Sequence, residues 1–219
     1  MGHKVNPLGF RLPLDKDWRS RWFAPDEETY KKYLLEDYKI RRFLEEKLKL
    51  AGLVRVQIDR FFNKIKITLY VSRPGMVIGR GGKGLELLKQ ELCKIVSVPD
   101  PEKNLELEEI VEVKNPDLSA LLVAQRIAEQ LVKRVPYRMV VEKAIERVKS
   151  AGAKGVKIVL SGRIAGIEIA RHEIFGDQGK SANIPASTLR ADIDYAEVPA
   201  LTRSGYVGVK VWIYKGEKE

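Results

Sequence analysis

Residues 76–84 read MVIGRGGKG, and this glycine-rich loop constrains the fold more than any other feature of the chain. The alternating apolar residues of 65–71 predict a strand before the loop, and Pro74-Gly75 ends that strand several residues early. The helical spacing of apolar residues over 85–96 predicts an amphipathic helix after it. A loop placed between a short helical turn and a helix is a candidate for binding phosphate.

The letters GRGGKG at 79–84 also satisfy G-x-G-x-x-G, the pattern of a dinucleotide-binding fold. That fold needs its strand to run directly into the loop, and Pro74-Gly75 prevents this. The letters G-K-G lack the Ser or Thr that a P-loop places on magnesium. A nucleotide cofactor therefore ranks behind a structural turn, and both rank behind a nucleic-acid clamp.

The clamp reading uses the shorter pattern G-x-x-G, which covers Gly79, Arg80, Gly81 and Gly82. Glycines without a Cβ atom allow a sugar-phosphate chain to approach the backbone closely. Arg80 and Lys83 place positive charge at the point of contact. This pattern between two helices is typical of the K-homology (KH) fold.

The elements around the loop follow the order of a type II KH domain. Asp26 and Gly52 bound a predicted helix, in which Asp37 and Arg41 are spaced to pair with each other. Strand patterns follow at 54–59, 65–71 and 105–113. We therefore expect a KH domain over residues 26–114, with a three-stranded sheet and helices on one face.

Residues 1–25 predict an extended basic arm, because Pro7, Gly9, Pro13 and Pro25 interrupt any regular element. Basic residues alternate there with aromatic residues that could stack on RNA or simply pin the arm to the core.

A second α/β domain is expected over residues 115–219, after the boundary at Asn115-Pro116-Asp117. Two helices are predicted to pack on a mostly antiparallel four-stranded sheet. The predicted helices are 118–135 and 137–151, and the predicted strands are 155–161, 164–175, 188–197 and 206–214. The fold class is therefore α+β, with two domains behind a basic arm.

Charge gives the first functional signal. Forty basic and thirty acidic residues give a net charge of +10, which favours an anionic partner, with nucleic acid ahead of a membrane surface. No apolar run reaches the ~18 residues of a membrane span, and the start lacks a signal-peptide core. We expect a soluble intracellular protein.

Sequence offers little support for an enzyme, a metal site or a cofactor. The chain has one cysteine, Cys93, and His172-Glu173 does not continue into H-E-x-x-H. Asp192 and Asp194 share one face of a predicted strand and could in principle bind a metal, but a solvated or Arg190-paired face is favoured. We therefore predict no cofactor and no catalytic residue.

Five separated motifs resemble the bacterial-type small-subunit ribosomal protein three family, in the right order and nearly end to end. They read MGHKVNPLGFRL, PGMVIGRGGKG, GAKGVKIVLSGRIAGIEIARHE, TLRADIDYAE and GYVGVKVWIYKGE. The resemblance implies a structural protein in the head of the small ribosomal subunit, in a bacterial cytoplasm or in an organelle. Its implied partners are small-subunit ribosomal RNA, the messenger RNA in its entrance channel and neighbouring head proteins, with no membrane.

Basic residues in and beside these motifs, together with the clamp, are the RNA-binding candidates. They are Lys4, Arg11, Gly79, Arg80, Gly81, Gly82, Lys83, Lys133, Arg134, Arg138, Lys143, Arg147, Lys154, Lys157, Arg163, Arg171, Arg190 and Lys210. For the residues of the strands, an ordinary solvated strand face is the competing interpretation.

The chain departs from the family in LVKRVPYRMVVEKAI. The family's entrance-channel cluster there has two adjacent basic residues and a third three positions later. Here only Arg138 is basic, and Met139 and Glu142 occupy the other two positions. Because Glu142 opposes a phosphate, we expect weaker unwinding of structured message than in typical members.

Two other function classes compete with the ribosomal one. The first is a free-standing KH protein, either a messenger-binding regulator or a ribosome-assembly factor, which would need neither the arm nor the second domain. The second is an enzyme that uses its KH domain to reach RNA.

Overall fold

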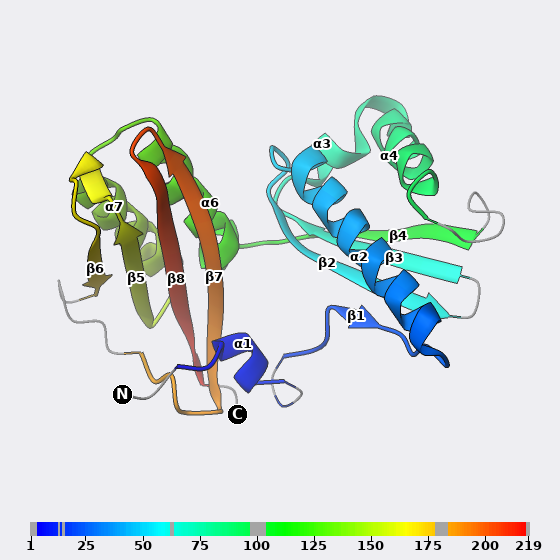
Figure 1. The fold of residues 1–219 in the computed structure, drawn as a ribbon, viewed down its shortest axis with the longest axis horizontal. Coiled ribbons are helices and arrows are strands. Elements are labelled where there is room, and N and C mark those ends of the chain that lie inside the picture. The colour runs from blue at the N-terminus through cyan, green and yellow to red at the C-terminus, as the bar shows by residue number, and fades with distance from the viewer. Residues whose placement is uncertain are drawn as a thin grey trace. The chain divides into compact units, whose positions relative to one another are not determined.

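The structure, a computed structural model, describes residues 4–12, 14, 16–61, 64–96, 104–177 and 184–217. The chain divides into two compact units. One unit is residues 18–114, and the other combines residues 1–17 with residues 115–219 (Figure 1). In the described residues no helix is both long and apolar enough to cross a membrane.

The unit of residues 18–114 has a four-stranded sheet in the order β1-β2-β3-β4. The central pair β2–β3 is antiparallel, and the outer pairs β1–β2 and β3–β4 are parallel. The elements, in chain order, are β1 (Ser20–Arg21), α2 (Glu27–Lys47), β2 (Leu53–Phe61), β3 (Lys64–Val71), α3 (Pro74–Ile78), η1 (Arg80–Gly82), α4 (Lys83–Cys93) and β4 (Leu105–Glu112).

The core of this unit forms where one face of the sheet meets one stripe of each long helix. Ile40 and Leu44 of α2 and Leu92 of α4 are buried with alternate residues of β2 and β3. Burial of each such side chain stabilises the fold by about 1.5–3 kcal/mol. The acidic first turn and basic last turn of α2 complement its helix dipole.

The second unit has a fully antiparallel sheet in the order β6-β5-β8-β7, with two long helices. The elements of residues 115–219 are η2 (Pro116–Leu118), α6 (Ala120–Val132), α7 (Tyr137–Ser150), β5 (Gly155–Gly162), η3 (Ile164–Gly166), β6 (Arg171–Gly176), β7 (Ala191–Thr202) and β8 (Gly205–Glu217).

The helices cover one face of this sheet, and strict alternation in β8 determines which face. Val207, Val209, Val211 and Ile213 are buried in the same core as α6 and α7. Between them lie Lys210 and Trp212, which belong to the face without helices. The prediction of two helices on a four-stranded antiparallel sheet is confirmed.

The arm predicted over residues 1–25 is not one extended element. Residues Pro7–Phe10 form helix α1, with Pro7 at its first position and the Asn6 side chain accepting a hydrogen bond from the Leu8 amide. Further on, Ser20–Arg21 pairs with β2 as a fourth strand, so the expected three-stranded sheet is wrong by one strand. The segment is shared between the two units, and Pro13 lies outside the described residues.

Arg11, predicted to bind RNA, is instead a structural residue. Its side chain is fully buried, and Nε donates a hydrogen bond of 2.7 Å to the Ala191 carbonyl. The two Nη atoms donate to the carbonyls of Pro7, Ala186 and Thr188 at 2.8–3.1 Å. The guanidinium thus joins α1 to the chain leading into β7, and a phosphate has no access to it.

The pairing of Asp37 with Arg41 is replaced by another arrangement. Asp37 accepts a hydrogen bond of 2.6 Å from Arg60 on β2, and the pair is buried. Arg41 instead donates to the carbonyls of Val56 and Arg19, which ties α2 to β2 and to the residue before β1. Burial lowers the pKa of Arg41 below its ordinary value, against the raising effect of Asp37.

The strand predicted over residues 164–175 begins late. Residues Ile164–Gly166 form the single turn η3, in which Ala165 has φ 56°, and β6 starts only at Arg171. Gly166, with φ 78°, also leaves the extended conformation. Ile164, Ile167 and Ile169 therefore lie in a loop and not in a strand.

We predict that Arg11→Met lowers the free energy of unfolding by at least about 3 kcal/mol, because it leaves several buried carbonyls without a donor. Arg11→Lys should recover only part of this loss, since an ammonium lacks the fork of donors that reaches four carbonyls. Urea unfolding of the full chain measures both. Lys4→Met, an exposed change on the same segment, is the control, and equal losses for Lys4→Met and Arg11→Met would contradict the assignment.

Candidate nucleic-acid interface

The glycine loop, which contains the single turn η1, joins the short helix α3 to the longer helix α4. Its backbone turns sharply because Gly79, Gly81 and Gly82 all have positive φ, at 68°, 64° and 80°. Residues other than glycine rarely adopt this backbone conformation. The expected short helical turn before the loop is present as α3.

Two different requirements explain the glycines. A Cβ atom on Gly84 would lie 2.7 Å from the Val77 carbonyl oxygen, so Gly84 allows α3 and α4 to pack backbone against backbone. Around Gly81 and Gly82 a Cβ atom would meet nothing within 4 Å. These two positions therefore combine a left-handed backbone with open space, which is what the close approach of a ligand backbone requires.

Positive charge surrounds this open backbone. The side chains of Arg80 and Lys83 are exposed, and Lys83 is the first residue of α4. The amino-terminal end of a helix carries a partial positive charge that favours anions. Val77 and Leu88 are buried close to the loop and hold it on the core. The loop can thus bind a phosphate through its backbone and through two cations.

In the second unit, several predicted residues gather at one end of the sheet, which we call the hairpin end. The β7–β8 turn lies there, since Thr202 pairs with Gly205, and Gly162 of β5 pairs with Arg171 at the start of β6. Helix α6 starts at the opposite end, where its Ala120 amide donates to Asp194. The α6–α7 turn therefore also reaches the hairpin end (Figure 1).

The hairpin end carries six exposed basic side chains, which lie in or beside three separate loops. Five were predicted from sequence, and the sixth, Arg203 in the β7–β8 turn, was missed. Its position in a short turn between two alternating strands was the only signal that could have indicated it. The six are Lys133, Arg134, Arg138, Arg163, Arg171 and Arg203.

Arg138 is held in place by its neighbour. Its guanidinium lies 5.8 Å from the centre of the Tyr137 ring, and its Nε donates a hydrogen bond of 3.3 Å to the Tyr137 hydroxyl. That hydrogen bond raises the pKa of Arg138. The hydroxyl in turn donates to Glu173 of β6 at 3.3 Å. A cation oriented in this way loses less side-chain entropy when it binds an anion.

At the opposite end lie Lys4, Lys154 and Arg190, all exposed, and Lys157, which is half-buried. The Lys157 ammonium is 5.5 Å from the centre of the Trp212 ring, and burial together with the charge of Lys4 lowers its pKa. Two cations in each other's field favour an anion between them.

Lys210 is less available, because its ammonium lies 3.5 Å from Glu197 across the β7–β8 pair. Glu197 also accepts a hydrogen bond of 3.1 Å from the Tyr195 hydroxyl. Burial, and then the charge of Glu197, raise the pKa of Tyr195 to about 12. On this part of the face without helices, the charges of Lys210 and Glu197 therefore already compensate each other.

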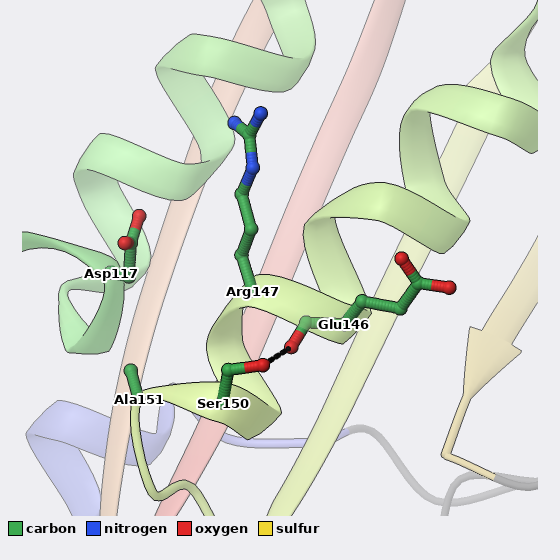
Figure 2. Close-up of a pocket in the computed structure, with 5 residues that line it drawn as sticks. All are labelled: Asp117, Glu146, Arg147, Ser150 and Ala151. Carbon is green, nitrogen blue, oxygen red and sulfur yellow. Dashed lines mark hydrogen bonds between the residues drawn. The ribbon is translucent and has the colours of Figure 1, made fainter.

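Lys143 and Arg147 are also separated from the other cations by their surroundings. Both are on the exposed face of α7, where Glu142 and Glu146 interrupt the positive charge. Arg147 lines a shallow, open depression with Asp117 and Glu146, whose side chains do not converge on a common point (Figure 2).

Asp192 and Asp194, the two aspartates considered as metal ligands, both bind other groups of the protein. Asp192 forms an ion pair with Lys16 at 2.6 Å, and Asp194 accepts a hydrogen bond of 2.9 Å from the first amide of α6. In the chain as described, no three His, Cys, Asp or Glu side chains are grouped to hold a metal ion. Arg190 is not the partner of either in these contacts.

Known proteins of similar sequence identify the family of this chain. The family model described as "KH domain" matches residues 39–118, and the one described as "Ribosomal protein S3, C-terminal domain" matches residues 127–213. Small ribosomal subunit protein uS3 of Caldicellulosiruptor saccharolyticus is 50% identical over 217 residues, which cover 99% of this chain and 93% of that protein. This chain belongs to the uS3 family.

Two further uS3 proteins, from Caldicellulosiruptor bescii and Desulforamulus reducens, are each 48% identical over the same shares of the two chains. The resemblance inferred from the five motifs is thereby confirmed. The match to the KH model includes the glycine loop, and the match to the uS3 C-terminal model begins within α6 and includes α7 and most of the four-stranded sheet.

Proposed function

We propose that this protein is a structural constituent of the small ribosomal subunit head. In this proposal it binds small-subunit ribosomal RNA, adjoins other head proteins and contributes to the mRNA entrance channel in the cytoplasm. The observation that carries the proposal is the open, left-handed backbone of Gly81 and Gly82 between exposed Arg80 and Lys83. Identity of 50% to a small ribosomal subunit protein over nearly the whole chain supports it.

Electrostatics explains how such a surface binds RNA without reading its sequence. Each phosphate that a lysine or arginine neutralises releases counterions, so affinity falls steeply as salt rises. The hairpin end supplies six exposed cations for this purpose, and the clamp adds Arg80 and Lys83. Contacts of this kind fix a protein's position on folded RNA, which is what a structural ribosomal protein requires.

We infer action by binding and not by catalysis. The carboxylates of Asp192 and Asp194 hold Lys16 and the start of α6, so both already have structural roles. His172 is on the exposed edge strand β6, opposite Ser161. Neither arrangement resembles a nucleophile with its general base.

Sedimentation of the native protein tests the proposal. We expect near-stoichiometric protein in the small subunit and in translating ribosomes, on a sucrose gradient at a salt concentration that strips loosely bound factors. Protein found at the top of the gradient, or only on immature particles, would instead indicate a free-standing KH regulator or an assembly factor.

The clamp is tested by the double change Arg80→Asp/Gly81→Asp, which puts two anions against the phosphates. Aspartate tolerates the left-handed conformation better than most residues, and the space around Gly81 is open, so the fold should persist. We expect about tenfold weaker binding to single-stranded RNA, measured by fluorescence anisotropy. Lys32→Glu/Lys39→Gln, on exposed positions of α2, changes the net charge by the same −3 and is the control, and equal losses in both double variants would refute a specific clamp.

The departure in α7 gives a third test. Met139 and Glu142 are exposed on the same face as Lys143, so basic residues there would reach a passing message. We expect Met139→Arg/Glu142→Lys to speed translation through a stable hairpin by about twofold to fivefold. Glu146→Lys/Ser150→Lys, on exposed positions further along α7, adds the same three charges and is the control. Equal rates for the double variant and the unchanged protein would dismiss the idea.

A further inference from the structure

Arg134, in the turn between α6 and α7, has φ 61° and so adopts the left-handed conformation. In the described part of the chain, nine glycines have positive φ, and Ala165 is the only other residue besides Arg134 that does. An L-residue with a long side chain is strained in this conformation, because its Cβ atom crowds the following carbonyl. Such strain persists only where something else compensates for it.

Helices α6 and α7 end in the same way, which provides an internal comparison. At the end of α6 the Arg134 amide donates to Leu131, and the Val135 amide donates to Gln130. At the end of α7 the amides of residues 152 and 153 donate to the carbonyls of residues 149 and 148. Both are Schellman motifs, in which the left-handed position usually belongs to glycine.

At α7 that position is Gly152, with φ 97°. At α6 it is Arg134, although the hydrogen-bonded geometry is equivalent. Glycine would form the same turn without steric cost. The turn itself therefore does not explain the arginine.

Contacts within the protein do not explain it either. Arg134 is exposed, and among the described residues its side chain forms no salt bridge and no hydrogen bond. A cation at the carboxyl end of α6 does favour the helix dipole, but Lys133 at the C-cap already supplies one. What remains is its location, at the hairpin end beside Lys133 and Arg138.

We propose that Arg134 is kept in the left-handed position because its guanidinium binds the sugar-phosphate backbone of RNA, so that stability is given up for binding. The left-handed residue lies in the turn between α6 and α7, and its side chain is exposed. Together with Lys133 and the oriented Arg138 it forms a phosphate-binding corner. A guanidinium fork matches phosphate oxygens and carries no base preference, so the contact is independent of sequence. The inference rests on the proposed RNA-binding function.

Three variants of the full chain test this. Arg134→Gly relieves the strain and removes the contact, so the melting temperature should rise by about 2–4 °C. Its affinity for a single-stranded oligouridylate should fall about threefold to fivefold, with a salt slope that is smaller by about 0.7. Arg134→Gln keeps the strain, so affinity should fall with the melting temperature unchanged. Gly152→Ala, at the matched end of α7, should lower the melting temperature and leave affinity unchanged.

Two results would overturn the inference. One is a melting temperature that does not rise for Arg134→Gly, which would show that the position is not strained. The other is RNA affinity that stays at the level of the unchanged protein in both Arg134 variants. If that affinity stays unchanged in Arg134 variants while Arg80→Asp/Gly81→Asp loses it, only this inference fails. If every variant binds as before, or the unchanged protein does not bind, the proposed function fails with it.

Discussion

Left-handed backbone at the turns is the constraint on which both candidate RNA-binding surfaces depend. The clamp needs three left-handed residues, Gly79, Gly81 and Gly82, around Arg80 to bring its amides and Arg80 to the surface. At the hairpin end the same constraint falls on Arg134 and on Ala165, which follows Arg163 closely. Regular helices and strands satisfy their own polar groups, so a ligand finds free backbone and unpaired cations mainly where the regular structure is interrupted.

Buried cations have the opposite role and explain why a charge of +10 overstates the binding surface. Arg60 forms an ion pair with Asp37 at 2.6 Å and stacks 4.5 Å from the Tyr33 ring, with both charges nearly inaccessible to solvent. The loss of one partner from such a pair costs about 3–5 kcal/mol, because the other charge is left buried and unpaired. Arg11 similarly uses its fork on carbonyls. Both cations hold segments together and do not attract RNA.

How much the sequence could predict depends on the separation of the interacting residues. The alternation at 207–213 and the glycine loop are local patterns, and they predicted a strand and a loop between two helices, which are present as β8 and as the segment between α3 and α4. Arg11 meets Ala191 across 180 positions, and no local pattern reports that contact. Asp37 had a plausible partner at i+4, but the tertiary partner Arg60 replaced it because burial strengthens that interaction. A left-handed arginine has no sequence signature at all.

The distribution of partners among the exposed cations finally favours the ends of the second sheet over its open face. On that face Lys210 lies beside Glu197, and Lys157 lies over Trp212, so part of each charge is already compensated or desolvated. At the hairpin end the cations lie in turns or at the ends of helices and strands, and the printed partners are neutral: Arg138 donates to the Tyr137 hydroxyl, and Arg163 donates to the Ile167 and Ser204 carbonyls. A phosphate therefore gains more at the hairpin end, because among the described residues it displaces no carboxylate from an ion pair there. The strands provide a rigid support, and the turns provide the charge.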